Sequence, residues 1–134
     1  MCEMLVPHVH IYSHLSEPPA TNDAVELQAS RFVLSFEQAF ARLERLPRMF
    51  IEMDGSWVWC GQEGDRRWQI DGMLYDRDGS LQRVESKGDA PRQIWEQLLN
   101  SLGWPTAPLV VHWVDQQRFH SVPEFLNEIP IRIL

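Results

Sequence analysis

The sequence predicts a single α+β domain, in which a mixed or mostly antiparallel sheet of about five strands packs against two main helices. Three observations support this prediction. Two segments have the apolar spacing of helices, several short segments read as strands, and Asp-Gly pairs follow strands as hairpin turns do. The expected order from residue 35 is helix, three or four strands, helix, strand. A chain of 134 residues is long enough for one ordinary core.

The N-terminal part is expected to differ from the rest of the chain. Residues 5–12 fit a strand, and residues 14–23 are a polar, proline-containing stretch typical of a loop. Residues 1–34 are therefore predicted to form a strand followed by a partly flexible loop, and residues 35–134 to form the globular core. The apolar residues 131–134 fit an additional edge strand.

Capping residues mark where the two main helices begin. Ser35 and Gln38 match a capping box, in which each side chain binds the backbone amide of the other residue. Apolar residues follow at helical spacing as far as Leu46, and Pro47 ends the helix. Asp89 is expected to cap the second main helix, whose apolar stripe follows it.

Short segments between the two helices, and one after the second, are predicted as strands. Asp54-Gly55 fits a two-residue hairpin turn, and Arg77-Asp78-Gly79 fits a second turn. Ser121 and Glu124 form another capping box, which opens a short helix at about 123–127. The expected strands are 49–53, 56–60, 68–75, 81–87 and 109–114.

Composition and charge restrict the class of protein. Hydrophobic residues make up 44% of the chain and charged residues 23%, as in globular proteins. The net charge of −7 disfavours binding to phosphate backbones unless cationic side chains cluster. The sequence has no signal-peptide pattern and no apolar run near the ~20 residues of a membrane helix, so the expectation is a soluble cytoplasmic protein with no membrane partner.

One predicted hairpin carries residues suited to a reaction. Lys87 is the only lysine of the chain, and it follows Glu85 by two positions. A three-residue turn at 77–79 would place Asp71 directly opposite Glu85, with Cβ atoms ~5 Å apart. Two carboxylates at that distance favour a bound cation, and Mg²⁺ prefers oxygen ligands. Lys87 on the same face would orient or deprotonate an attacking water.

A different turn length removes this site. A two-residue turn at Asp78-Gly79 would place Asp71 opposite Ser86, with Glu85 and Lys87 on the other face. The plain interpretation is then that Asp-Gly makes a turn and that charged side chains cover a solvated strand face.

The hairpin residues resemble those of the PD-(D/E)xK nuclease superfamily. The resemblance lies in Asp71-Gly72 on one arm and Glu85-Ser86-Lys87 on the next, within a similar order of elements over residues 35–114. It implies that Asp71 and Glu85 bind Mg²⁺ and that Lys87 stabilises the water or the developing charge. Some members add an acid from the first helix, for which Glu37 or Glu44 are the candidates.

Histidines at even spacing form a second candidate site. On an extended strand, His8 and His10 share a face with His14 and Tyr12. Imidazoles so placed bind zinc or copper. Because a straight strand separates His8 from His14 too widely for one ion, the feasible set is His8 with His10 and a distant third ligand. The alternative is that these histidines lie on a solvated N-terminal arm.

Trp57 and Trp59 also share a strand face, and Trp68 follows on the next strand. They fit a stacking platform for bases, a groove for a peptide, or part of the core.

Two functions remain open from the sequence. The first is a small non-catalytic domain that binds a protein partner or acts as an accessory protein. The second is a magnesium-dependent phosphodiesterase that acts on nucleic acid through Asp71, Glu85 and Lys87.

Overall fold

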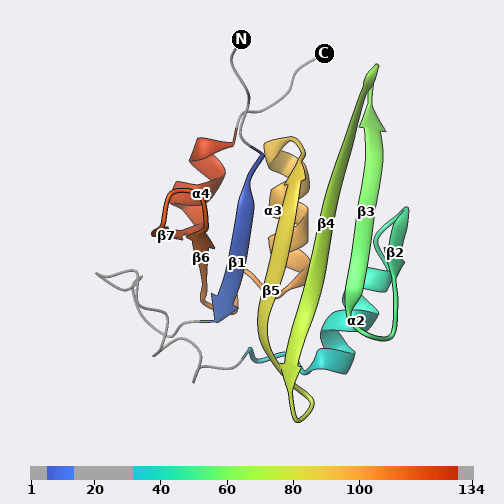
Figure 1. Ribbon diagram of the computed structural model, residues 1–134, viewed down its shortest axis with the longest axis vertical. Helices are drawn as coiled ribbons and strands as arrows, with labels where there is room; N and C mark the ends of the chain where they lie inside the picture. Colours follow the sequence, from blue (N-terminus) through green and yellow to red (C-terminus); the bar gives the residue numbers. More distant parts are fainter. Residues whose placement is uncertain (1–5, 14–31, 130–134) are drawn as a thin grey trace.

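The protein forms one seven-stranded sheet that carries three helices in the described part of the chain (Figure 1). The structure is a computed structural model, and it describes residues 6–13 and 32–129. The predicted loop at 14–23 and the predicted edge strand at 131–134 lie outside these residues. The strands are β1 (His8–Ser13), β2 (Met49–Ile51), β3 (Ser56–Glu63), β4 (Arg66–Arg77), β5 (Ser80–Asp89), β6 (Leu109–Trp113) and β7 (Arg118–Ser121). The helices are α2 (Phe36–Glu44), α3 (Arg92–Ser101) and α4 (Val122–Glu128).

The strands lie in the order β2-β3-β4-β5-β1-β6-β7, and every neighbouring pair is antiparallel. The prediction of an α+β domain with a mostly antiparallel sheet is confirmed, but the predicted number of about five strands is too low. The sequence did not indicate β7, a four-residue strand whose burial lacks a clear alternation. β1 lies between β5 and β6, so a strand from the start of the chain lies inside the sheet and not at its edge.

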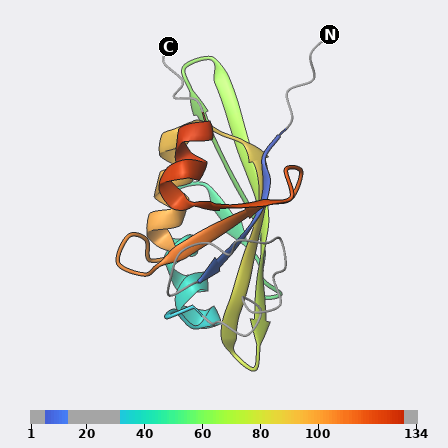
Figure 2. The same cartoon turned by 90° about the vertical axis from the view of Figure 1, so that its left-hand side faces the viewer.

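All three described helices cover the same face of the sheet, as Figure 2 shows. Strand side chains alternate between faces, and Val9, Ile11, Val84 and Val111 point into the core with the helices. Trp95 of α3 packs edge-on against Phe125 of α4, with ring centroids 5.3 Å apart. We call this side the helix-covered face and the opposite side the open face, which is turned toward the viewer in Figure 1. No described helix has the length and apolar character needed to cross a membrane.

The helix starts follow the capping rules in two cases out of three. The capping boxes Ser35/Gln38 and Ser121/Glu124 are both present, which confirms the predicted starts of α2 and α4. The prediction that Asp89 caps α3 is wrong, because Asp89 is the last residue of β5. Pro91 occupies the N-cap position there and makes no side-chain capping bond.

The β4–β5 turn has a register that determines which residues share the open face. Arg77 pairs with Ser80, so the turn contains only Asp78 and Gly79, both with positive φ (54° and 86°). This is the backbone of a two-residue hairpin turn, which favours glycine. The register then shifts beyond Tyr75, which leaves Gln82 as the additional residue of a β-bulge in β5.

Candidate functional site

The candidate site lies in the middle of the open face, where β1 meets β5. Since Val9 and Ile11 are in the core, the alternating residues His8, His10 and Tyr12 point to the open face. The same alternation places Arg83, Glu85 and Lys87 of β5 on this face, because Val84 and Ser86 between them are fully buried. His10 lies directly across from Glu85, and His8 lies across from Lys87.

Glu85 interacts with two imidazoles at once. The His8 Nε2 atom lies 2.7 Å from the Glu85 Oε2 atom, and the His10 Nε2 atom lies 3.7 Å from the same oxygen. One ligand atom from each of the three residues lies within 4.8 Å of the other two. The three side chains are between 21% and 28% exposed, so they are partly shielded but still reach solvent.

A tyrosine supports the carboxylate, and an arginine lies over the ring of that tyrosine. The Tyr75 hydroxyl donates to the Glu85 Oε1 atom at 2.9 Å. The Arg83 guanidinium lies over the Tyr75 ring, 4.0 Å from the ring centroid. Tyr75 and Arg83 are directly opposed on β4 and β5. Tyr75 therefore holds the second Glu85 oxygen from the β4 side, opposite to the histidines of β1.

These contacts change the pKa values of the site. Burial raises the pKa of Glu85, but hydrogen bonds from His8 and Tyr75 outweigh it, so the pKa lies below its ordinary value. Burial lowers the pKa of His10 more than the Glu85 carboxylate raises it, and Arg83 lowers it further. Near neutral pH the shifts favour an ionised Glu85 and a neutral His10, which are the forms that bind metal ions.

The arrangement matches the ligand set of a transition-metal site. Two imidazoles and one carboxylate bind Zn²⁺, and the same set with open positions binds non-haem Fe²⁺. Ligand atoms ~2.1 Å from a tetrahedral ion lie roughly 3.4 Å apart, close to the 3.7 Å between His10 and Glu85. The shorter 2.7 Å contact between His8 and Glu85 has to widen by less than ~1 Å to admit the ion.

A further histidine adjoins this set. His112 of β6 is directly opposite His10. Its Nε2 atom and the Nδ1 atom of His10 are buried and have no hydrogen-bond partner among the described residues. Burial also lowers the pKa of His112, which favours its neutral form.

The predicted register of the Asp71–Glu85 pair is wrong. Asp71 pairs with Lys87, and Glu85 pairs with Met73, so the two acids are diagonal neighbours, for which a separation of about 7–8 Å is usual. The alternative that placed Glu85 and Lys87 on the other face is wrong as well. The bulge at Gln82 adds one residue to the two-residue turn and returns both side chains to the face of Asp71.

Asp71 has different neighbours from Glu85. The Gln69 side-chain amide donates to the Asp71 carboxylate at 2.8 Å. A Cβ atom at the adjacent Gly72 would lie 2.0 Å from the Trp57 ring, so close packing on the helix-covered face requires this glycine. Glu37 and Glu44, the acids considered on the first helix, belong to α2, which lies across the sheet from Glu85 (Figure 2).

The tryptophans belong to the core. Trp57, Trp59 and Trp68 are 2%, 1% and 5% exposed, so they form no stacking platform. Trp59 and Trp68 instead pack edge to face, with centroids 5.0 Å apart.

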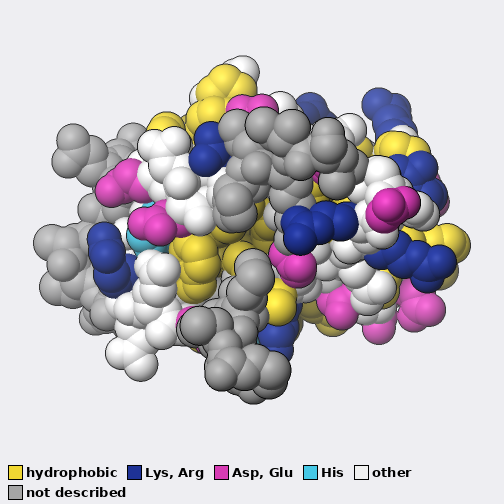
Figure 3. Space-filling view, turned by 90° about the horizontal axis from the view of Figure 1, so that it is seen from above, with side chains coloured by type: hydrophobic (Ala, Val, Ile, Leu, Met, Phe, Trp, Pro, Cys, Tyr) yellow, Lys and Arg dark blue, Asp and Glu magenta, His cyan; other side chains and the backbone are white. Residues whose placement is uncertain are grey.

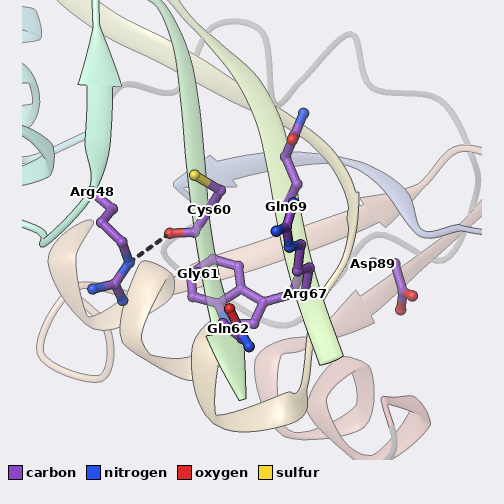
Figure 4. Close-up of a pocket in the computed structure, with 8 residues that line it drawn as sticks. Arg48, Cys60, Gly61, Gln62, Arg67, Gln69 and Asp89 are labelled. Atoms are coloured by element: carbon purple, nitrogen blue, oxygen red, sulfur yellow. Dashed lines mark hydrogen bonds between the residues drawn. The ribbon is translucent and has the colours of Figure 1, made fainter. Parts of the chain in front are cut away.

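A sizeable cavity lies away from the histidines. It has a volume of about 600 Å³ at the end of β3 and β4, and its lining includes Arg48, Arg67 and Trp68 (Figure 4). Arg48 is held there by a 3.1 Å hydrogen bond from its Nε atom to the Cys60 carbonyl. His8, His10 and Glu85 do not line this cavity, so we base the candidate site on ligand geometry and not on cavity size.

Sequence reasoning identified each metal-ligand candidate but not how they combine. The even spacing of His8 and His10 indicated a pair of ligands that lacked a third. Glu85 was instead predicted to share a Mg²⁺ ion with Asp71. The strand pairing of β1 with β5, over 77 residues of chain, joins them. Tyr75 and His112 were not indicated, because their roles depend only on which strands are neighbours. Acidic and basic side chains are interspersed over the described surface when the molecule is viewed from above (Figure 3).

The fold and the site together define an α+β protein with a histidine–carboxylate cluster on the open face of an antiparallel sheet. Comparison with protein-family models, with curated proteins and with solved structures finds no match.

Proposed function

We propose that this protein is a small metal-binding domain that holds one divalent transition-metal ion on its open face through His8, His10 and Glu85. The observation that carries the proposal is the convergence of three ligand atoms, each within 4.8 Å of the others, from two adjacent strands. The domain acts by binding, in keeping with the non-catalytic accessory role considered from the sequence. The mixed nitrogen and oxygen set favours Zn²⁺ or another imidazole-binding ion over Mg²⁺.

The surroundings of the three residues support this proposal. Ligating carboxylates in metal sites are themselves hydrogen-bonded, as Glu85 is by Tyr75. Structural zinc sites have four protein ligands, whereas three protein ligands and partial exposure leave room for an exchangeable fourth.

Competition with a chromophoric chelator tests the proposal. Wild-type protein is expected to withdraw one equivalent of Zn²⁺, and Glu85→Gln to weaken binding by about 100-fold or more, since loss of a supporting residue alone costs 10–100-fold. Asp71→Asn is the matched control, because it removes a carboxylate from the same face without removing a ligand. Equal Zn²⁺ affinity in wild type and Glu85→Gln would refute the assignment.

The magnesium-dependent phosphodiesterase remains a second candidate. The observation that favours it is that Asp71, Glu85 and Lys87 all lie on the open face. Nucleic-acid cleavage that requires Mg²⁺ or Mn²⁺ and disappears in both Lys87→Ala and Asp71→Asn would support it. The metal-binding proposal instead expects Asp71→Asn to retain its Zn²⁺ affinity, so the two candidates are separable.

A further inference from the structure

Two cationic side chains lie beside the three proposed metal ligands. Arg83 and Lys87 lie two residues before and after Glu85 on the same strand face. Successive side chains on one face of a strand are ~6.6 Å apart, within reach of a ligand bound to the same ion. The only cationic side chains of β5 therefore flank the proposed metal position.

Arg83 is fixed in place and has unused donor capacity. Its guanidinium lies on the Tyr75 ring, and its Nε atom is buried with no hydrogen-bond partner among the described residues. Burial lowers the pKa of His10 and raises the pKa of Tyr12, and the charge of Arg83 acts on both groups, so the guanidinium lies within electrostatic range of β1. A buried donor without a partner is costly, and a shift of the guanidinium toward a bound anion would satisfy it.

The site changes from neutral to positive when the ion binds. Without the ion, the two negative charges of Asp71 and Glu85 cancel the two positive charges of Arg83 and Lys87, which occupy neighbouring positions on β4 and β5. A divalent ion then leaves the region with about two positive charges, although the whole chain has a net charge of −7. A doubly negative ligand neutralises this region better than a carboxylate with a single charge does.

We propose that the metal-loaded site binds a phosphate group, with one oxygen on the ion and others on Arg83 and Lys87. This inference rests on the proposed metal binding and names the ligand class of the same site. The planar guanidinium presents paired donors that match phosphate oxygens, and the lysine adds a mobile point charge. The partial exposure of all three metal ligands leaves the ion accessible to such a ligand.

Cobalt substitution tests this inference, because the visible spectrum of Co²⁺ reports its ligands directly. Inorganic phosphate and phenyl phosphate are expected to change the spectrum of the Co²⁺-loaded protein, and acetate at the same concentration is not. Equal effects of the two phosphates indicate recognition of the phosphate group alone, and tighter binding of phenyl phosphate indicates a phosphate monoester as ligand.

Variants separate this site from general attraction of anions. Arg83→Gln and Lys87→Gln are each expected to weaken phosphate binding by about 10-fold and to retain Co²⁺ binding, since each removes a charge-assisted hydrogen bond. Arg67→Gln is the matched control, because Arg67 lines the remote cavity. Lys87 is exposed, so its variant is expected to fold normally.

The possible failures are distinguishable. If the protein binds no Co²⁺ or Zn²⁺, both the proposed function and this inference are wrong. If Co²⁺ binds but phosphate leaves its spectrum unchanged, only this inference is wrong. It is equally wrong if phosphate binds the metal-free protein as tightly as the loaded protein, or if neither Arg83→Gln nor Lys87→Gln weakens binding.

Discussion

The two faces of the sheet use the same strand alternation for different purposes. On the helix-covered face, residues such as Ile11, Val84 and Trp95 are almost fully buried, and packing accounts for their positions. On the open face, β1 and β5 present His8, His10 and Glu85 as partly buried groups, with the Glu85 carboxylate beside both imidazoles. The His10 Nδ1 and His112 Nε2 atoms are buried without a hydrogen-bond partner among the described residues, which is unusual for a face that is only solvated. The core therefore lies on the helix-covered face, and the groups of the proposed metal site lie on the open face.

The largest effect is expected when a side chain of the helix-covered face is removed, and it is a loss in the free energy of unfolding. Trp95→Ala removes a side chain with 0% exposure and is expected to lower the free energy of unfolding by about 3–5 kcal/mol. Phe50→Ala removes an aromatic side chain that is 67% exposed on the β2 edge, and its effect is expected to be within about 0.5 kcal/mol. Urea unfolding of both variants measures the difference. Similar losses would show that burial does not distinguish these regions.

Metal binding is expected to stabilise the protein through the open face. At a free Zn²⁺ concentration 100 times the dissociation constant, the gain in free energy of unfolding is about 2.7 kcal/mol. His10→Asn should abolish most of this gain, whereas His120→Gln should retain it, because the buried His120 ring lies against Trp113 on the helix-covered face, away from the cluster. Thermal unfolding with and without Zn²⁺ checks this, and a gain that survives in His10→Asn contradicts the site.

A smaller effect is expected from the group that supports Glu85. Tyr75→Phe removes the hydroxyl that donates to Glu85 and leaves the ring under Arg83. We expect Zn²⁺ affinity to fall by about 10-fold, the lower end of the range for supporting residues in metal sites. The chelator competition assay measures this. An unchanged affinity would mean that Tyr75 does not orient the carboxylate.

The smallest effect concerns pH in the metal-free protein. Burial lowers the pKa values of His10 and His112 below 6.5, so the unfolded chain binds these protons more tightly than the folded protein does. The contribution of these two histidines to the free energy of unfolding is therefore complete above pH 6.5, and it is lost as the pH falls through their pKa values in the folded protein. Urea unfolding at pH 7.5, 6.5 and 5.5 should show this loss, with a shallower slope in His10→Asn. Rising stability on acidification would contradict the assigned direction.

Local signals predicted the elements but not the partners of the strands. The capping boxes at Ser35 and Ser121 act within four residues, so the sequence was sufficient to locate α2 and α4. The pairing of β1 with β5 joins residues far apart in the chain, and no local pattern encodes it. The two-residue turn and the bulge at Gln82 together move Asp71 from opposite Glu85 to opposite Lys87, and the separate register of β1 against β5 places Glu85 opposite His10.

The most direct test is the position of the ion itself. An anomalous difference map from a crystal of the zinc-loaded protein should show one peak about 2.0–2.1 Å from the Nε2 atoms of His8 and His10 and from a Glu85 oxygen. Zinc bound only elsewhere, with the His8–Glu85 hydrogen bond intact, would contradict the central claim that the open face is a metal site.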